Sequence, residues 1–296
     1  MREKNEDTII KISDDQYPKL LREINDPPNQ LHVRGNTDLL NEPELLAVVG
    51  SRKANHYGQH AISNLLDPAV QQGVVLVSGL AFGIDSLAHR LSVKHNQPTI
   101  AVLGCGIDDN TIYPRRHLVL AHEILNAGGA IISEYPTGTP ALPHQFPARN
   151  RIISGMCKAT IVIQAAKRSG SLITARLALE EGRDVYAVPG AINDPLSKGT
   201  NHLIQQGATP TIEPENILDI FNFRATKRTK KRSSPNLSTQ QASIINHLTT
   251  EPKHIDQLAE ESSIPTTTIS VLLIELELAN HIVNVGGMRY VKKVNS

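Results

Sequence analysis

Residues 45–52 decide the fold, and they read Leu45-Leu46-Ala47-Val48-Val49-Gly50-Ser51-Arg52. The first five residues form a short, fully apolar run, which is typical of a parallel strand that is buried on both faces. The run ends in a glycine turn, and a helical pattern follows at about residues 57–72. A strand, a turn and a helix in this order predict one unit of a parallel sheet that is covered by helices.

The same alternation continues toward the C-terminus. Apolar runs predict further strands at 74–78, 99–103, 130–132, 160–164 and 185–188, and helical patterns cover 85–95, 148–155 and 172–181. The expected fold class is therefore α/β, with a mostly parallel sheet and helices on both faces. Ligands of such sheets bind outside the carboxyl ends of the strands, so the loops after the strands are the places to search.

The last sixty or so residues follow a different pattern. Three helical segments at 238–248, 254–261 and 266–279 precede two β-prone runs at 282–285 and 289–291. Gly286-Gly287 lies between these runs and favours a hairpin turn. Three helices and a hairpin predict a small C-terminal winged-helix domain.

Composition excludes several classes of protein. The chain has 296 residues, of which 40% are hydrophobic, so it is long enough for two domains with sizeable cores. Two cysteines exclude a disulfide scaffold and a four-thiolate zinc site. The longest apolar run, 45–49, is far shorter than a membrane span, and the charged N-terminus has no apolar signal core. We therefore expect a cytoplasmic protein without a membrane partner.

The net charge of +1 predicts no nucleic-acid partner, but the charge is distributed unevenly. Residues 224–232 carry six positive charges and no acid, whereas residues 236–296 carry four basic and six acidic side chains. The basic run precedes a loop-forming cluster, so we expect a flexible linker at 223–236 that is either a plain connector or an electrostatic tether for phosphates. The linker would divide the chain into a lead-in at 1–43, an α/β domain at 44–222 and the winged-helix domain at 237–296.

Three loops offer groups that bind phosphate. In the first, Gly50-Ser51-Arg52, glycine lets a ligand approach the backbone and arginine provides a bidentate fork, although the loop could be a plain turn. In the second, Arg149 and Arg151 flank an amide, and two arginines at this spacing face different directions, so one can bind a ligand while the other forms an internal ion pair. Nearby Phe146 is either core or a platform for an unstacked base.

The third loop is Ser169-Gly170-Ser171, in which Ser171 can cap the following helix and Gly170 frees backbone amides for an anion. Lys167 and Arg168 stand just before it. The chain contains neither the dinucleotide-binding glycine pattern nor the phosphate loop of nucleotide triphosphatases.

Signals of enzyme chemistry are weaker. Asp85 and Glu134 could act as bases, but they lack a paired nucleophile or a metal cluster. Cys105 could be a nucleophile, although a buried and inert cysteine fits the sequence better. We expect no catalytic residues, no metal and no cofactor.

Seven motifs, taken together, carry a family resemblance. They occur in order at 50–52, 78–85, 113–115, 133–136, 146–155, 169–175 and 182–190, and include Phe146-Pro147-Ala148-Arg149-Asn150-Arg151. With these motifs the chain resembles the bacterial DNA-processing protein A (DprA/Smf) family over about residues 15–208, and its tail looks like that family's winged-helix extension.

The resemblance implies an extended Rossmann-like core that forms a homodimer and has no enzyme activity. It implies a protein that binds and protects incoming single-stranded DNA and loads the RecA recombinase in natural transformation. Many members carry a helical SAM-like N-terminal domain, which we do not expect here. In this chain Ser51, Arg52 and Arg115 would contact phosphates, and Arg115 stands where many members have lysine. The remaining residues expected around the same pocket are Gly50, Phe146, Arg149, Arg151, Lys167, Ser169, Gly170 and Ser171.

One alternative of a different class stays open. Distant Rossmann relatives of the lysine-decarboxylase-like group hydrolyse nucleotides with a Pro-Gly-Gly-x-Gly-Thr loop and a nearby glutamate. This chain has Val188-Pro189-Gly190-Ala191 instead, which disfavours that activity. Within the tail, the third helix has no basic residue and two acids, so we expect it to dock a protein or regulate the chain rather than to be the main DNA reader.

Overall fold

A computed structural model describes residues 7–223, 238–249, 251–278 and 281–292. The chain divides into two compact units, Met1–Ala225 and Thr226–Ser296. The expected basic linker at 223–236 lies outside the described residues except for Phe223, as does Ala279, where the third helix of the tail was expected to end. Within the described residues, no helix is long and apolar enough to span a membrane.

The first unit is built on a nine-stranded sheet with the order β1-β2-β6-β5-β4-β3-β7-β8-β9. The strands β3 to β9 run parallel to one another, which confirms the α/β fold class. Their bounds are β3 Leu45–Val49, β4 Val75–Ser78, β5 Thr99–Leu103, β6 Ala130–Ser133, β7 Ala159–Val162, β8 Asp184–Ala187 and β9 Thr209–Pro210.

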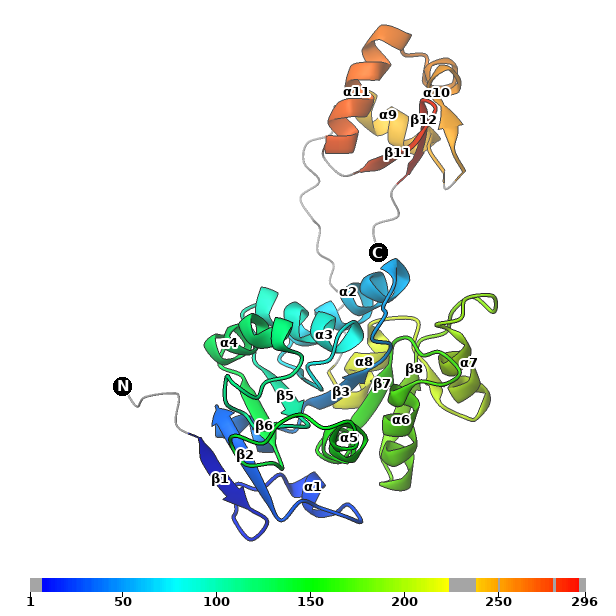
Figure 1. The fold of residues 1–296 in the computed structure, drawn as a ribbon. Coiled ribbons are helices and arrows are strands. Elements are labelled where there is room, and N and C mark those ends of the chain that lie inside the picture. Colours follow the sequence, from blue (N-terminus) through cyan, green and yellow to red (C-terminus); the bar gives the residue numbers. More distant parts are fainter. Residues whose placement is uncertain (1–6, 224–237, 250, 279–280, 293–296) are drawn as a thin grey trace. The chain divides into compact units, whose positions relative to one another are not determined.

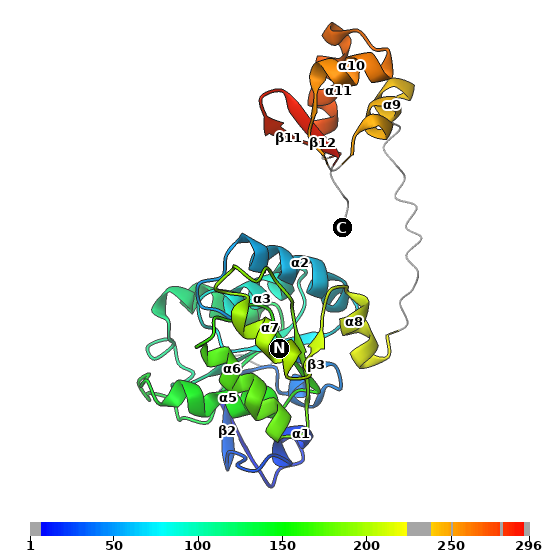
Figure 2. The same ribbon diagram turned by 90° about the vertical axis from the view of Figure 1, so that its right-hand side faces the viewer.

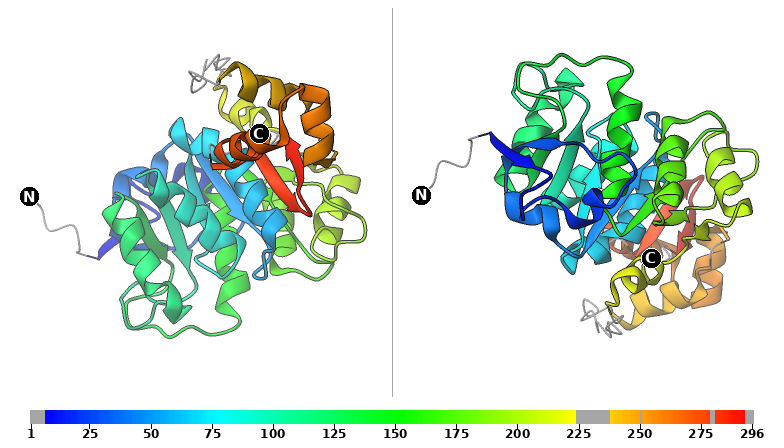
Figure 3. Two further views of the ribbon diagram at one scale, coloured as in Figure 1. Left: turned by 90° about the horizontal axis from the view of Figure 1, so that it is seen from above. Right: turned by 90° about the horizontal axis from the view of Figure 1, so that it is seen from below.

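Helices cover both faces of this sheet (Figure 1). The helices α2 (His56–Gln71), α3 (Ile84–Lys94) and α4 (Leu118–Asn126) lie on one face, and α5 (Gln145–Gly155) and α6 (Gly170–Glu180) lie on the other, as Figures 2 and 3 show from other sides. Alternate residues of β3 serve the two cores, because successive side chains of a strand point to opposite faces. Leu46 and Val48 pack with α2 and α3, whereas Leu45, Ala47 and Val49 pack with α5 and α6.

The segment before β3 adds two antiparallel strands to the same sheet, and the sequence analysis assigned no strand to it. Strand β1 (Thr8–Lys11) pairs with β2 (Gln30–Gly35), and β2 pairs with β6. Helix α1 (Lys19–Arg22) contributes the fully buried Leu21 to the core that contains α5. The pairing of β2 with β6 joins residues about a hundred positions apart, so no local pattern in the sequence indicates it.

Other expected elements differ from the structure at their ends. Strand β7 ends at Val162 rather than at Gln164, and α5 begins at Gln145, three residues before the expected start. Pro147 does not delay that helix because it stands in the first turn, where its missing amide hydrogen has no helical partner. The helices α4, α7 (Lys198–Gln205) and α8 (Glu215–Leu218) were not expected.

The second unit has the three helices and the hairpin that the sequence analysis expected. The helices are α9 (Thr239–His247), α10 (Ile255–Ser262) and α11 (Thr266–Leu278), and the small sheet has the order β10-β12-β11. Strand β10 is Lys253–His254, and β11 (Ile282–Gly286) and β12 (Arg289–Lys292) form the hairpin. The core of this unit is aliphatic, with Leu258, Leu273 and Leu276 fully buried.

Candidate nucleic-acid interface

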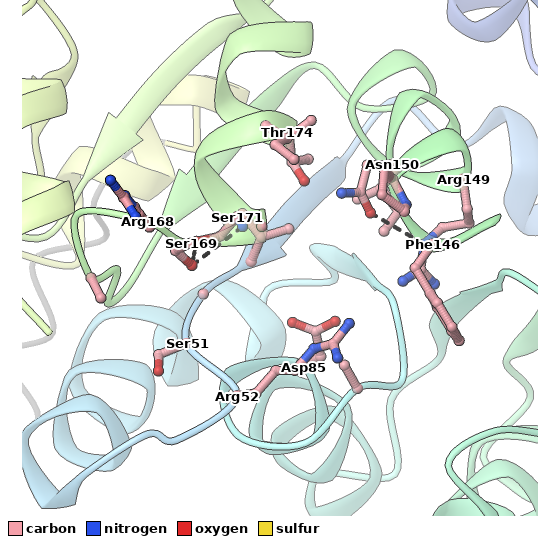
Figure 4. A pocket seen from close by; sticks show the side chains of 18 of the residues that line it. Ser51, Arg52, Asp85, Phe146, Arg149, Asn150, Arg168, Ser169, Ser171 and Thr174 are labelled. Carbon is pink, nitrogen blue, oxygen red and sulfur yellow. Dashed lines mark hydrogen bonds between the residues drawn. The ribbon is translucent and has the colours of Figure 1, made fainter. Parts of the chain in front are cut away.

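A pocket of about 600 Å³ opens at the carboxyl ends of β3 and β7 (Figure 4). The two strands are neighbours, yet the connection after β3 leads to β4 on one side while the sheet continues from β7 to β8 on the other. A parallel sheet leaves a crevice at such a reversal of strand order, because the helices that follow the two strands cover opposite faces. The pocket therefore lies where the loops after the strands were expected to bind a ligand.

The turn after β3 forms one wall of the pocket. At residue 50 a Cβ atom would come within 2.6 Å of the Ile84 side chain, so only glycine lets the turn pass this close to α3. The Ser51 backbone amide donates to the Gln164 carbonyl oxygen at 2.7 Å, and the Ser51 hydroxyl accepts from the Lys53 amide at 3.1 Å. All three residues line the pocket, but Ser51 is buried and stabilises the turn, whereas Arg52 and Lys53 are exposed.

The opposite wall is the start of α6. Ser169 is the N-cap of this helix, and its hydroxyl accepts from the Ser171 amide at 3.4 Å. The expectation that Ser171 provides the cap is wrong, because the helix begins at Gly170, two residues before the expected start at residue 172. Ser169, Gly170 and Ser171 all line the pocket, and nothing lies within 4 Å of the place where a Cβ of residue 170 would stand. An anion can therefore approach the amides and the positive end of the α6 dipole.

Aromatic side chains lie beside these phosphate-binding groups. The Arg52 guanidinium stands 5.8 Å from the centre of the Phe146 ring, and the Phe146 and Tyr113 rings are 5.6 Å apart. Phe146 is half-buried and belongs to none of the apolar cores of the described residues, so it is not a core residue. The pocket thus combines cations with ring faces on which a base can stack.

Arg149 lines the pocket but is bound from within the protein. Its side chain is only 4% exposed, and it donates to the carbonyl oxygens of Gly79, at 3.0 Å, and Val102. The Asp85 carboxylate accepts from the Gly79 amide at 3.1 Å, so both charged groups hold the turn after β4. Burial raises the pKa of Asp85 and lowers that of Arg149 to about 10, and in each case the charge of the partner opposes the shift.

Three of the expected site residues do not line the pocket. The Arg151 side chain forms ion pairs with Glu134 at 2.7 Å and Asp26 at 3.1 Å, so it carries the internal pairing that was expected of one of the two arginines. Arg115 is exposed and donates to the Asp109 carbonyl oxygen. Lys167 is exposed in the loop after β7, but its neighbour Arg168 is the residue that lines the pocket.

Sequence reasoning missed several lining residues. Arg168 follows Lys167 directly and Tyr113 stands two positions before Arg115, and only the direction of the chain in each loop distinguishes these residues from the expected ones. Lys53, Asp85, Asn150 and Thr174 line the pocket as well. The lining then holds four cationic side chains (Arg52, Lys53, Arg149 and Arg168) and one carboxylate, Asp85. The positive excess suits a polyanion, although the net charge of the chain does not predict one.

The family described as DNA recombination-mediator protein A matches residues 8–222, and its winged-helix domain, described as the DprA winged helix domain, matches residues 228–288. The chain belongs to this family. It is therefore a DNA-processing recombination mediator, and the family resemblance inferred from the seven motifs is confirmed. The second match identifies the C-terminal unit as a winged helix.

Individual relatives agree with this assignment. The Smf protein of Escherichia coli K12 is 41% identical over 286 residues, which cover 94% of this chain and 76% of that protein. The X-ray structure of DprA from Streptococcus pneumoniae has a TM-score of 0.67 at 43% identity and covers 73% of this chain and 75% of that one. A structure of the Helicobacter pylori protein, whose description reports its single-stranded DNA binding mode, has a TM-score of 0.65 at 30% identity and covers 75% of this chain and 98% of that one.

The side chains that were considered for enzyme chemistry are paired or buried within the fold. Glu134 pairs with Arg151, and Asp85 lies buried beside Arg149. Burial also raises the pKa of the Cys105 thiol, which disfavours the thiolate that a nucleophile requires. Among the described residues, no group of three or more His, Cys, Asp or Glu side chains could hold a metal ion.

Proposed function

We propose that this chain binds single-stranded DNA in the pocket between β3 and β7. The observation that carries the proposal is the arrangement of the exposed Arg52 and Lys53 opposite the α6 N-terminus, with the Phe146 ring 5.8 Å from the Arg52 guanidinium. Phosphates would bind to the cations and the helix amides, and a base would stack on the ring. The single-stranded DNA binding described for the Helicobacter pylori relative supports the same ligand for this chain.

The pocket geometry favours single strands over duplexes. A base can reach a ring that stands inside a concave site only when it is unstacked and unpaired, because a duplex covers the faces of its bases. A phosphate and the face of a base are common to all nucleotides, so contacts of these two kinds carry little sequence information. We therefore propose little dependence on sequence.

The resemblance to the family supports a wider role. We propose that the chain protects incoming single strands and loads RecA during natural transformation, that it works as a homodimer in the cytoplasm, and that it catalyses no reaction. The site residues in this proposal line the pocket, with the exception of Arg115, Arg151 and Lys167, and the lining members are Gly50, Ser51, Arg52, Phe146, Arg149, Ser169, Gly170 and Ser171.

A gel-shift comparison tests the ligand. Single- and double-stranded DNA of equal length would be titrated with the full chain across a salt series. We expect tighter binding of the single strand, with an affinity that falls as salt rises because each neutralised phosphate releases counterions. Equal affinity for the duplex at moderate salt would contradict the proposal.

Nucleotide hydrolysis is the competing function. The open, cationic pocket could also admit a nucleoside monophosphate, and Asp85 lines it. Incubating the protein with nucleoside monophosphates and measuring released base separates the two functions. We expect no release, and turnover that disappears in an Asp85→Asn variant would establish the enzyme instead.

A further inference from the structure

Gln164 is buried behind the pocket and bonded to both ends of the turn that carries Arg52. It lies two residues after β7, is 1% exposed and is not one of the lining residues. Its carbonyl oxygen accepts from the Ser51 amide at 2.7 Å. Its side chain forms two hydrogen bonds with Asn55, the N-cap of α2. One residue of β7's loop therefore holds residues 51 and 55, and Arg52 and Lys53 lie between these two points.

The hydrogen bonds between the two amides have a defined polarity. The Asn55 side-chain oxygen accepts from the Gly58 amide at 3.2 Å, as an N-cap must. The same oxygen accepts from Gln164 Nε2 at 2.7 Å, and Gln164 Oε1 accepts from the Asn55 backbone amide at 3.3 Å. Residue 164 must therefore donate at one terminal atom and accept at the other, which a carboxamide does and a carboxylate cannot.

Close packing keeps the Gln164 side chain in this position. A Cβ atom at residue 58 would stand 2.2 Å from Gln164 Oε1, so glycine at the start of α2 leaves just enough room for the amide. On the other side, Asn55 Nδ2 donates to the Asp194 carboxylate at 3.4 Å. A side chain so enclosed restricts the turn to one conformation.

We infer that Gln164 is a positioning residue for DNA binding: it sets the affinity of the pocket by holding the turn 51–55 so that Arg52 faces the ligand, without touching the DNA. The inference rests on the proposed function. A turn that is already ordered loses less conformational entropy when a phosphate binds, so the clamp increases affinity.

Two substitutions in the full chain test the inference. Gln164→Met keeps the length of the side chain and removes both of its hydrogen bonds, and Gln164→Glu keeps the shape but places a carboxylate oxygen against the Asn55 oxygen. Each should bind single-stranded oligothymidylate about fivefold to tenfold more weakly at neutral pH, the change expected from one or two lost hydrogen bonds. Binding would be measured by fluorescence anisotropy, and folding by circular dichroism.

A pH series separates hydrogen-bond polarity from general damage. A protonated glutamate can donate as the amide does, so Gln164→Glu should recover most of its affinity between about pH 8 and about pH 5.5, relative to wild type. Gln164→Met should recover nothing. A glutamate variant that stays weak at the lower pH, or a methionine variant that binds as wild type does, would overturn the inference.

Two further variants serve as controls. Thr99→Val removes a hydroxyl that is equally buried and also makes two hydrogen bonds, to the Leu76 carbonyl oxygen at 2.6 Å and from His89 Nδ1 at 2.9 Å, at the end of β5 away from the pocket. It should bind DNA normally, and a loss equal to that of Gln164→Met would mean that destabilisation alone explains the effect. Arg52→Ala tests the proposed function: if it binds normally, the pocket is not the DNA site, whereas if it alone is weak, only the role of Gln164 is refuted.

Discussion

The arginine side chains around the pocket differ in what binds them. Arg149 and Arg151 are held by carbonyl oxygens and carboxylates of the protein, so little of their hydrogen-bonding capacity is left for a ligand. Arg52 is exposed, and its guanidinium lies 5.8 Å from the centre of the Phe146 ring. A contact with a ring face leaves the hydrogen-bond donors of the guanidinium available for a phosphate. Arg52 is therefore the residue whose loss should affect binding most directly.

We expect Arg52→Ala to weaken single-strand binding more than Lys53→Ala does. Arg52 would lose a charge-assisted contact of about 1.5–3 kcal/mol. Lys53 also lines the pocket, but lysine binds phosphate as a flexible point charge with weaker geometry. Parallel titrations of the two variants at one salt concentration measure the difference, and equal losses would refute the assignment to Arg52.

His89 should make the fold sensitive to acid. It is fully buried, and the Thr99 hydroxyl, which donates to Leu76, accepts from His89 Nδ1 at 2.9 Å. Its Nε2 atom has no hydrogen-bond partner among the described residues. Burial, together with the positive fields of His117 and Arg149, lowers the pKa of His89 from 6.5 to about 3.

The sign of the pH effect follows from this shift. Between pH 6.5 and about 3 the unfolded chain binds the proton and the folded one does not, so stability is lost as the pH falls below 6.5. At pH 5 the loss should be about 2 kcal/mol. Urea unfolding at pH 7 and pH 5 should show a smaller drop for His89→Leu than for wild type, and equal drops would show that His89 titrates normally.

At the scale of elements, α11 lacks the features of a helix that reads DNA. Val271 and Ile274 are each 55% exposed on its outer face, and Glu275 and Glu277 are exposed beside them. At 100° per residue these two glutamates fall on either side of the strip that contains Val271 and Ile274. A major groove lined by phosphates would meet acids and aliphatic side chains here, which is unfavourable for binding.

We therefore expect a chain that ends at residue 235 to keep most of the single-strand affinity. This truncation retains the pocket and the basic run at 224–232, and the described part of the first unit has its own apolar cores. Gel shifts of the truncated and full chains would be compared after circular dichroism has confirmed folding. Loss of most of the affinity in a folded truncated protein would make the winged helix a DNA reader.

At the scale of the molecule, the proposed function requires a longer binding surface than one pocket. A pocket of about 600 Å³ holds a nucleotide or two, whereas protection of a strand needs contacts along it. Two copies of the chain would place two pockets on one strand, and linked sites raise the overall affinity without any new contact.

We expect the protein to be a homodimer at micromolar concentration. Light scattering should give about twice the chain mass of 32.3 kDa. The same measurement with Arg52→Ala serves as a control, because a pocket residue should not change the oligomeric state. A monomer mass at micromolar protein, in a sample that still binds single-stranded DNA, would count against the dimer.

The sequence predicts most of the parallel sheet and the position of the pocket. Residues 45–49 contain no polar side chain, and a strand of that kind is stable only between two layers of helices, so the α/β class follows from local pattern. Glycine turns after the strands indicate the ligand-binding edge, because ligands of parallel sheets bind outside the carboxyl ends of the strands. The turn 50–52 and the loop 169–171 were expected at one site, and the structure brings them together.

Contacts between distant segments decide the rest. Strand β2 joins the sheet through β6, and Gln164 meets Asn55 across 109 residues, neither of which leaves a periodic signal. The roles of the two arginines also depend on partners that the fold places beside them. Arg149 donates to Gly79 and Val102, and Arg151 pairs with Glu134 and Asp26. A local sequence pattern shows which side chains can bind an anion. Long-range packing decides which partner each arginine binds, because a charge that is buried in a low-dielectric interior must be paired or hydrogen-bonded.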